Sequence, residues 1–194
     1  MRVAIACVLC ALLALAGCRT APVIRPPAAA SGWEQRVATL QNADSWQLTG
    51  RAAVAVGTQG WQASLDWREK GGSAELHLAG PLGIGAQVIS QTGAGLAING
   101  VPASDATLQQ LQDKLGFELP IDNLRYWLLG VPDPHQPFEV AKNQNDRAQH
   151  LQQDGWAIEY DRYIPAGGDV LPGHLTLTRE SVRVRIVADH WDLK

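Results

Sequence analysis

The stretch SWQLTGRAAVAVGTQGWQASLDWREKGGSAELHL, residues 45–78, decides the fold. Apolar or small residues alternate with other residues at a period of two in three runs, Trp46–Val56, Trp61–Trp67 and Ala74–Leu78. Short glycine-containing turns separate the runs. Because side chains of a strand alternate between its two faces, this pattern is typical of antiparallel strands with one buried face. The stretch therefore predicts three consecutive strands that share one apolar side.

The same alternation recurs on the C-terminal side of this stretch. Further strands are expected at 86–92, 96–98, 138–142, 147–153, 156–160, 175–179 and 182–188. Helical spacing and capping residues predict three short helices, over 33–40, between Ser104 and Gly116, and over 121–129 after Pro120. We therefore expect a mainly β (α+β) domain with an open, curved antiparallel sheet of about ten strands, a half-barrel, and helices on one face.

Three short helices hardly fill the concave side of so large a sheet. We therefore expect an apolar cavity under a lid of helices, with an aliphatic and tryptophan-rich lining. The candidate lining residues are Trp67, Leu76, Trp127 and Trp156.

The N-terminus has the order of an export signal. Arg2 precedes the uncharged apolar run 3–15, which is too short to span a bilayer. The run ends in Leu15-Ala16-Gly17-Cys18, which resembles the lipobox of bacterial lipoproteins. We therefore expect residues 1–17 to be removed and Cys18 to carry covalent diacylglyceryl and N-acyl groups. The alternative is an ordinary secretory signal with a cysteine at its cleavage point by chance.

The mature chain then has two parts. Residues 18–32 are rich in proline, alanine and small polar residues, so we expect a flexible tether, followed by a folded domain over 33–194. The residue after Cys18 is Arg19, whereas lipoproteins retained in the inner membrane commonly have aspartate there. By this resemblance the chain is directed to the outer membrane, where the lipid anchors it.

Composition excludes several other classes of protein. The formal net charge is −3 and basic residues form no cluster longer than a pair, so a nucleic-acid partner is not expected. All three cysteines lie in the first 18 residues, so the mature domain has no internal disulfide. We expect it to act as a monomer.

No pattern in the chain predicts catalysis. Nucleophile-elbow, zinc-protease and P-loop spacings are absent, and the five histidines are scattered. We therefore expect no enzyme activity, no metal and no cofactor other than the lipid on Cys18. Two alternatives stay open, a lipid-anchored envelope hydrolase and a structural outer-membrane lipoprotein without transfer activity.

Several segments resemble the LolB family of outer-membrane lipoprotein receptors. They are the strand around Arg51, Gly80-Pro81-Leu82-Gly83, Leu119-Pro120-Ile121, Leu124–Gly130 and Val182–Trp191. The resemblance implies an open curved sheet with a helical lid over an apolar cavity. It also implies a protein at the periplasmic face of the outer membrane that accepts client lipoproteins from a soluble LolA-like carrier and inserts their acyl chains into membrane lipid. In this family a leucine in a loop between two strands takes part in membrane transfer. Leu82 matches it, flanked by Pro81 and Gly83.

The anchor gives the first testable prediction. Cys18→Ala is expected to block lipidation and cleavage at this site, because no other thiol lies at the small-residue boundary. A chain that starts near Ala21 and is exported by another signal is expected to fold and to bind a fluorescent acyl probe saturably. A folded protein without saturable binding would contradict the cavity hypothesis.

Overall fold

The computed structural model describes residues 32–194, a range that begins at the end of the expected tether. The expected signal and Cys18 lie outside the described residues. The strands are β1 (Ser45–Val56), β2 (Gln59–Lys70), β3 (Ser73–Ala79), β4 (Gln87–Thr92), β5 (Gly95–Ile98), β6 (Val101–Pro102), β7 (Phe138–Lys142), β8 (Ala148–Gln153), β9 (Trp156–Ala166), β10 (Asp169–Arg179) and β11 (Val182–Leu193). The helices are α2 (Gly32–Gln41), α3 (Asp105–Leu115) and α4 (Ile121–Leu128), with a single 3₁₀ turn, η1, at Pro81–Gly83.

All eleven strands form one antiparallel sheet in the order β6-β5-β4-β3-β2-β1-β11-β10-β9-β8-β7. The first and last strands of the chain pair with each other at its centre. The two edge strands, β6 and β7, are consecutive in the chain. The segment 103–137 that joins them must therefore run from one edge of the sheet to the other. It contains α3, α4 and their connection, and we call residues 105–128 the lid.

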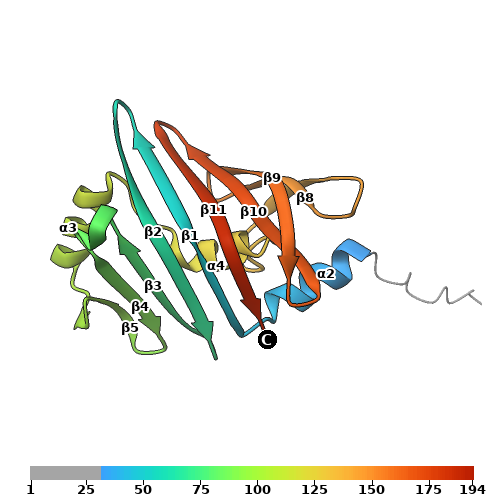
Figure 1. Cartoon of the computed structure of the whole chain (residues 1–194), viewed down its shortest axis with the longest axis horizontal. Coiled ribbons are helices and arrows are strands. Elements are labelled where there is room, and N and C mark those ends of the chain that lie inside the picture. Colours follow the sequence, from blue (N-terminus) through green and yellow to red (C-terminus); the bar gives the residue numbers. More distant parts are fainter. Residues whose placement is uncertain (1–31) are drawn as a thin grey trace, which may run out of the picture.

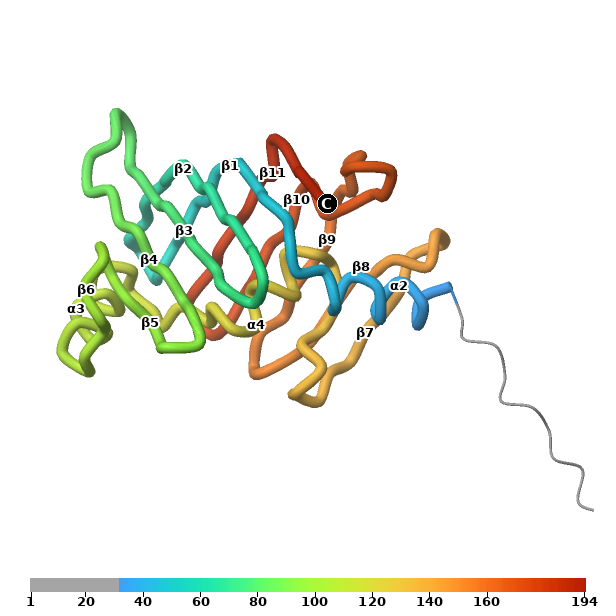
Figure 2. Tube along the Cα trace, turned by 90° about the horizontal axis from the view of Figure 1, so that it is seen from below, coloured from blue at the N-terminus to red at the C-terminus, as the bar shows by residue number. Residues whose placement is uncertain are grey.

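The lid lies on the concave side of the curved sheet (Figures 1 and 2). The strands bury alternate residues, as the period of two predicts. In β1 the buried residues include Trp46, Leu48 and Val54, and in β2 they include Leu65 and Trp67. The predicted fold class is thus confirmed: the sheet is open, curved and antiparallel, with three short helices within residues 32–194.

Two details of the sheet differ from the sequence prediction. The two-residue strand β6 was not expected. It forms because Asn99 and Gly100 both adopt positive φ, 51° and 79°, and make a tight turn after which the chain pairs with β5. Strands β9 to β11 are also longer than predicted. Pro172 interrupts the alternation in β10, where the pairing with β9 shifts register, so the pattern of that strand was obscured.

The capping residues predicted for α3 are confirmed. The Ser104 side chain accepts a hydrogen bond from the backbone N–H of Thr107, and the Thr107 hydroxyl in turn accepts one from the backbone N–H of Ser104. Gly116 ends the helix in the left-handed conformation, at φ 83°. These caps fix where the first half of the lid begins and ends.

A bulge at Gly50 bends the central strand pair. The register of β1 against β11 shifts between Thr49 and Gly50, so that the pairing of the two strands skips Asp189. A Cβ atom at Gly50 would lie 2.2 Å from the Val187 carbonyl oxygen, closer than two such atoms can approach. Only glycine allows the two backbones to approach this closely, and the bulge adds local twist and bending to the sheet.

Gly50→Ala is therefore expected to destabilise the domain by about 1–3 kcal/mol, the usual cost of overpacking. The matched control is Gly93→Ala, because a Cβ atom at Gly93 would meet no atom within 4 Å and the φ of Gly93 is not positive. The control is expected to stay within about 0.5 kcal/mol of the unchanged protein. Urea unfolding of both variants checks this, and equal midpoints would contradict it.

Candidate functional site

A small apolar cavity lies between the lid and the concave face of the sheet. Its wall comes from β1, β2, β3, the lid, β9, β10 and β11. The lining residues are Ala52, Val54, Trp61, Leu65, Leu76, Leu78, Leu115, Phe117, Leu119, Pro120, Leu124, Trp156, Leu177, Val184 and Ile186. Its volume is about 30 Å³, so little space is left between the lid and the sheet. The lid therefore rests on the sheet, and the apolar faces of both fill the interior.

Two of the four candidate lining residues lie on this wall, Leu76 and Trp156. Trp67 and Trp127 are fully buried in the core and are not among the residues that line this cavity. Trp67 stacks on Trp46, with ring centroids 6.1 Å apart, and Trp127 donates a hydrogen bond from Nε1 to Oε1 of Gln153 at 2.8 Å. Partners in the core thus hold both indoles, and the residues at the cavity wall are mostly aliphatic.

An open groove adjoins the cavity. It lies between α3 and the loop that joins β3 to β4, and has a volume of about 370 Å³. The groove and the cavity share Trp61, Leu78 and Leu115, so these side chains form the partition between them. Pro81 and Ile84 line the outer side of the groove. A movement of α3 away from β2 would join the groove to the cavity.

The loop 80–85 presents apolar side chains to solvent. Leu82 is 100% exposed and Ile84 is 72% exposed. Backbone hydrogen bonds from Gly83 N to Gly80 O (2.9 Å) and from Gly80 N to Ile84 O (3.0 Å) close the loop. Leu82 itself has φ 59°, a left-handed conformation that costs a residue other than glycine about 1 kcal/mol. The structure thus places Leu82 at a tip, between Pro81 and Gly83, and adds Ile84, which sequence reasoning did not single out.

The two helices of the lid are held in different ways. Hydrogen bonds connect α4 to three strands. Gln91 in β4 donates to Asp122. Tyr160 in β9 donates to the Trp127 carbonyl oxygen at 3.0 Å, and the Trp127 side chain donates to Gln153 at the end of β8. Helix α3 packs against the sheet through Leu111 and Leu115, and Trp61 Nε1 donates to the Leu115 carbonyl oxygen at the long distance of 3.4 Å. Apolar contacts thus dominate the hold on α3.

A buried ion pair adds to the hold on α4. Glu69 in β2 has a fully buried side chain, which forms an ion pair with Arg125 of α4 and accepts a hydrogen bond from Trp67 Nε1 at 3.2 Å. Burial raises the pKa of the Glu69 carboxyl above its ordinary value, against the opposing effects of Arg125 and Trp67. Sequence reasoning missed this pair. The signal was present, because the alternation of Leu65 and Trp67 places Glu69 on the same buried face.

Residues 32–194 contain no group of three or more His, Asp or Glu side chains with the arrangement of a metal site. Within the same range no helix is both long and apolar enough to cross a bilayer. The two buried side-chain nitrogens without a hydrogen-bond partner among the described residues are Asn123 Nδ2 and Trp156 Nε1.

Comparisons with known proteins agree on one family. The family model of the outer membrane lipoprotein LolB matches residues 44–191. The chain is 32% identical over 197 residues to the outer-membrane lipoprotein LolB of Nitrosococcus oceani, with 96% of each chain covered. It is 35% identical to that of Thiobacillus denitrificans, with 92% of this chain and 91% of the relative covered. The crystal structure of a LolA-superfamily protein from Nitrosomonas europaea superposes with a TM-score of 0.54 at 10% identity, over 85% of this chain and 94% of that one, and so shares the fold.

The Glu69–Arg125 pair predicts a pH-dependent defect. Arg125→Met leaves a buried carboxylate without its cation, which is expected to cost about 3–5 kcal/mol of stability at about pH 7.5. In the variant the folded-state pKa of Glu69 rises further above 4.5, its ordinary value. The folded protein then takes up a proton before the unfolded chain does, so the loss is present above that pKa and shrinks as the pH falls through it.

Urea unfolding of the variant at about pH 7.5 and about pH 5.5 measures this change. The control is the double variant Glu69→Gln/Arg125→Met, which buries no charge at position 69 and is expected to recover most of the stability at the higher pH. A loss from Arg125→Met that is equal at both pH values would contradict the prediction.

Proposed function

The chain belongs to the LolB family of outer-membrane lipoproteins, and from this membership we propose that it accepts lipoproteins from a soluble periplasmic carrier, shelters their acyl chains and inserts them into the outer membrane. The observation that carries the proposal is the apolar concave face of the open sheet, which is covered by a separate lid. Transfer of acyl chains between apolar environments breaks no covalent bond, so the function needs no catalytic residue, metal or nucleotide.

The proposed function must keep acyl chains out of water, because their exposure costs free energy. Each methylene group that leaves an apolar environment for water costs about 0.8 kcal/mol, so an acyl chain must pass from one apolar surface to the next. The lid offers such a surface. The apolar faces of lid and sheet cover each other and leave a cavity of about 30 Å³. Entering acyl chains replace those contacts and separate the two faces.

We assign the opening movement to α3. Polar contacts and the ion pair of Glu69 with Arg125 hold α4 on the sheet, whereas α3 rests mainly on apolar contacts. Acyl chains replace apolar contacts without loss, but they replace no hydrogen bond or ion pair. Separation of α3 from Trp61 joins the groove beside Ile84 to the cavity, and this groove is the entry that we propose for the acyl chains.

Release takes place at the membrane. The lipid groups on Cys18 keep the domain at the periplasmic face of the outer membrane, and residues 19–32 join it to this anchor. Leu82 and Ile84 then enter the lipid surface beside the groove, so that acyl chains leave the protein where membrane begins. The LolA-like carrier and the client lipoproteins are the partners, and one protomer is sufficient.

Leu82→Glu tests the delivery step. Because Leu82 is fully exposed, the melting temperature is expected to stay nearly unchanged, within the roughly 0.5 kcal/mol usual for surface substitutions. Uptake of lipoprotein from the carrier is also expected to survive, since Leu82 is not part of the cavity wall. Delivery to liposomes is expected to fall, because the variant loses the roughly 1.5–3 kcal/mol gained when leucine is buried in lipid.

The matched control is Val101→Glu, which removes another exposed apolar side chain, at the sheet edge in β6. It is expected to leave delivery intact. Melting, carrier-to-receptor transfer and receptor-to-liposome transfer are followed in one preparation of each protein. Loss of uptake together with delivery, or a melting temperature lowered by several degrees, would show that Leu82 acts in the fold and not at the membrane.

A further inference from the structure

Two exposed cations flank the loop 80–85, one on each side. Figure 2 shows this loop, between β3 and β4, projecting from the sheet. On one side lies the groove described above, which Ile84 lines from the loop and Lys114 lines from α3. On the other side is a second hollow, of about 360 Å³, which Arg51 of β1 and Leu82 line together. We call Arg51 and Lys114 the flanking cations.

The fold, and not the local sequence, brings these two charges to the loop. Residues 78–104 contain no Asp, Glu, Lys, Arg or His. Arg51 lies on the convex face of the sheet, because its neighbour Ala52 lines the cavity on the concave face. Lys114 lies in the last turn of α3, which belongs to the lid. The loop thus has one cation on the convex side of the sheet and one on the lid side.

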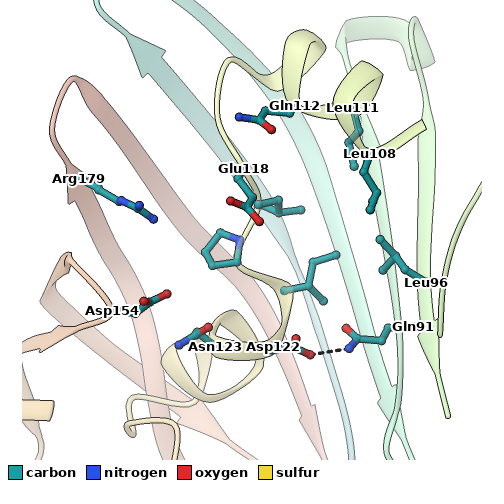
Figure 3. Close-up of a pocket in the computed structure, with 13 residues that line it drawn as sticks. Gln91, Leu96, Leu108, Leu111, Gln112, Glu118, Asp122, Asn123, Asp154 and Arg179 are labelled. Atoms are coloured by element: carbon teal, nitrogen blue, oxygen red, sulfur yellow. Dashed lines mark hydrogen bonds between the residues drawn. The ribbon is translucent and has the colours of Figure 1, made fainter. Parts of the chain in front are cut away.

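Carboxylates are kept away from this loop. Within residues 32–194, neither the groove nor the second hollow has an Asp or Glu among its lining residues. The opposite holds for the pocket in Figure 3, at the connection between α3 and α4. Its lining includes Glu118, Asp122 and Asp154, with Arg179 as the cation. The chain as a whole has a formal net charge of −3. The surroundings of the loop are therefore positive in a chain that is negative overall, and they attract an anionic surface that the pocket in Figure 3 repels.

Both flanking cations are available to a further anion. Lys114 is exposed and forms no ion pair within residues 32–194. Arg51 donates a hydrogen bond from Nη2 to Asp189 at 2.9 Å, and the two side chains are 68% and 51% exposed. Water screens such an exposed pair, so its hold on Arg51 is weak. The guanidinium of Arg51 also has further N–H donors for a second partner.

An apolar tip with a cation on each side fits the surface of a phospholipid membrane. When Leu82 and Ile84 enter the hydrocarbon, the residues at the base of the loop reach the level of the headgroups, where phosphates carry negative charge. Lysine and arginine are favoured at this level, because their methylene groups lie on apolar surface while their charges stay in water. Both also bind phosphate, arginine through paired N–H donors. A free anion would match the two cations but not the exposed apolar side chains between them.

We propose that Arg51 and Lys114 bind the phosphate groups of anionic membrane lipids on the two sides of the inserted loop. Because the two contacts lie on opposite sides of one loop, they fix the orientation of the domain as well as its depth. The groove, which has Lys114 on its wall, is thereby held at the membrane surface. The proposal rests on the proposed function and deepens it, since it names the lipid chemistry that the receptor recognises at its target membrane.

The test uses the mature lipidated chain in vesicles of neutral phosphatidylcholine, with and without anionic phosphatidylglycerol. An environment-sensitive fluorophore on Leu82→Cys reports whether the loop lies in lipid. The other cysteine of this chain, Cys18, carries lipid on its thiol, so the label reacts at position 82. Phosphatidylglycerol is expected to shift the insertion equilibrium of the loop by about ten- to thirtyfold, the effect of two basic residues at an anionic surface. High salt is expected to abolish this shift.

The double variant Arg51→Gln/Lys114→Gln is expected to lose the shift, whereas Arg51→Lys/Lys114→Arg, which keeps both charges, is expected to retain it. The matched control is Lys70→Gln/Arg162→Gln, which removes two exposed cations at the far end of β2 and in β9. It is expected to retain the shift. Inorganic phosphate is expected to act no more strongly than chloride at the same ionic strength. The melting temperature of each variant is measured alongside and is expected to stay unchanged, because all four positions are exposed.

An equal shift in the unchanged protein and in Arg51→Gln/Lys114→Gln would overturn the proposal. Loss of lipoprotein uptake from the carrier in that variant, with the shift retained, would assign the cations to the carrier instead. Competition by inorganic phosphate beyond the effect of salt would assign them to a free anion. If the unchanged protein delivers no lipoprotein to vesicles of either composition, the proposed function itself fails. Delivery that does not depend on phosphatidylglycerol would leave that function standing and reject only the role of the flanking cations.

Discussion

The pairing of the first strand with the last one determines the rest of the architecture. Because β1 and β11 lie side by side at the centre, both halves of the chain add strands outward from them, and the middle of the chain is left at the two edges of the sheet. The segment between β6 and β7 must cross from edge to edge. It covers the concave face and becomes the lid. The lid is thus a part of the chain that belongs to neither half of the sheet, and it can move without breaking a strand pair.

Different kinds of contact hold the two helices of the lid on the sheet, and this difference determines which helix can move. Arg125 and its neighbours in α4 make hydrogen bonds and an ion pair, which are directional and have no substitute in an acyl chain. Leu111 and Leu115 in α3 make apolar contacts, which an acyl chain replaces at little cost. In the proposed movement α4 therefore stays on the sheet while α3 moves away from it. In the proposed function the acyl chains of a client pass under the helix that moves.

The sequence predicted the fold well, whereas its assignments of site residues stay predictions. The alternation from Trp46 to Leu78 determined which side chains are buried, and Ser104 and Gly116 determined the ends of α3, because both signals are local. Alternation predicts which face of the sheet a residue lies on, but not which residues of that face line the cavity. It therefore does not distinguish Trp67, which lies outside the cavity wall, from its pairing partner Leu76 in β3, which lies on it. The missing partner of Asn123 depends on groups distant in the chain, and no local pattern indicates it.

The pairing at the centre also orders the folding of the chain. Trp46 pairs with Leu193 and Val56 with Val182, so β1 obtains one of its two neighbours only when the last strand has been made. Hairpins such as β1 with β2 and β2 with β3 close short loops and form early, whereas the central contact closes nearly the whole domain and bears the largest loop entropy. Because a chain is synthesised from its N-terminus, its two halves cannot join into a finished sheet before β11 has been made.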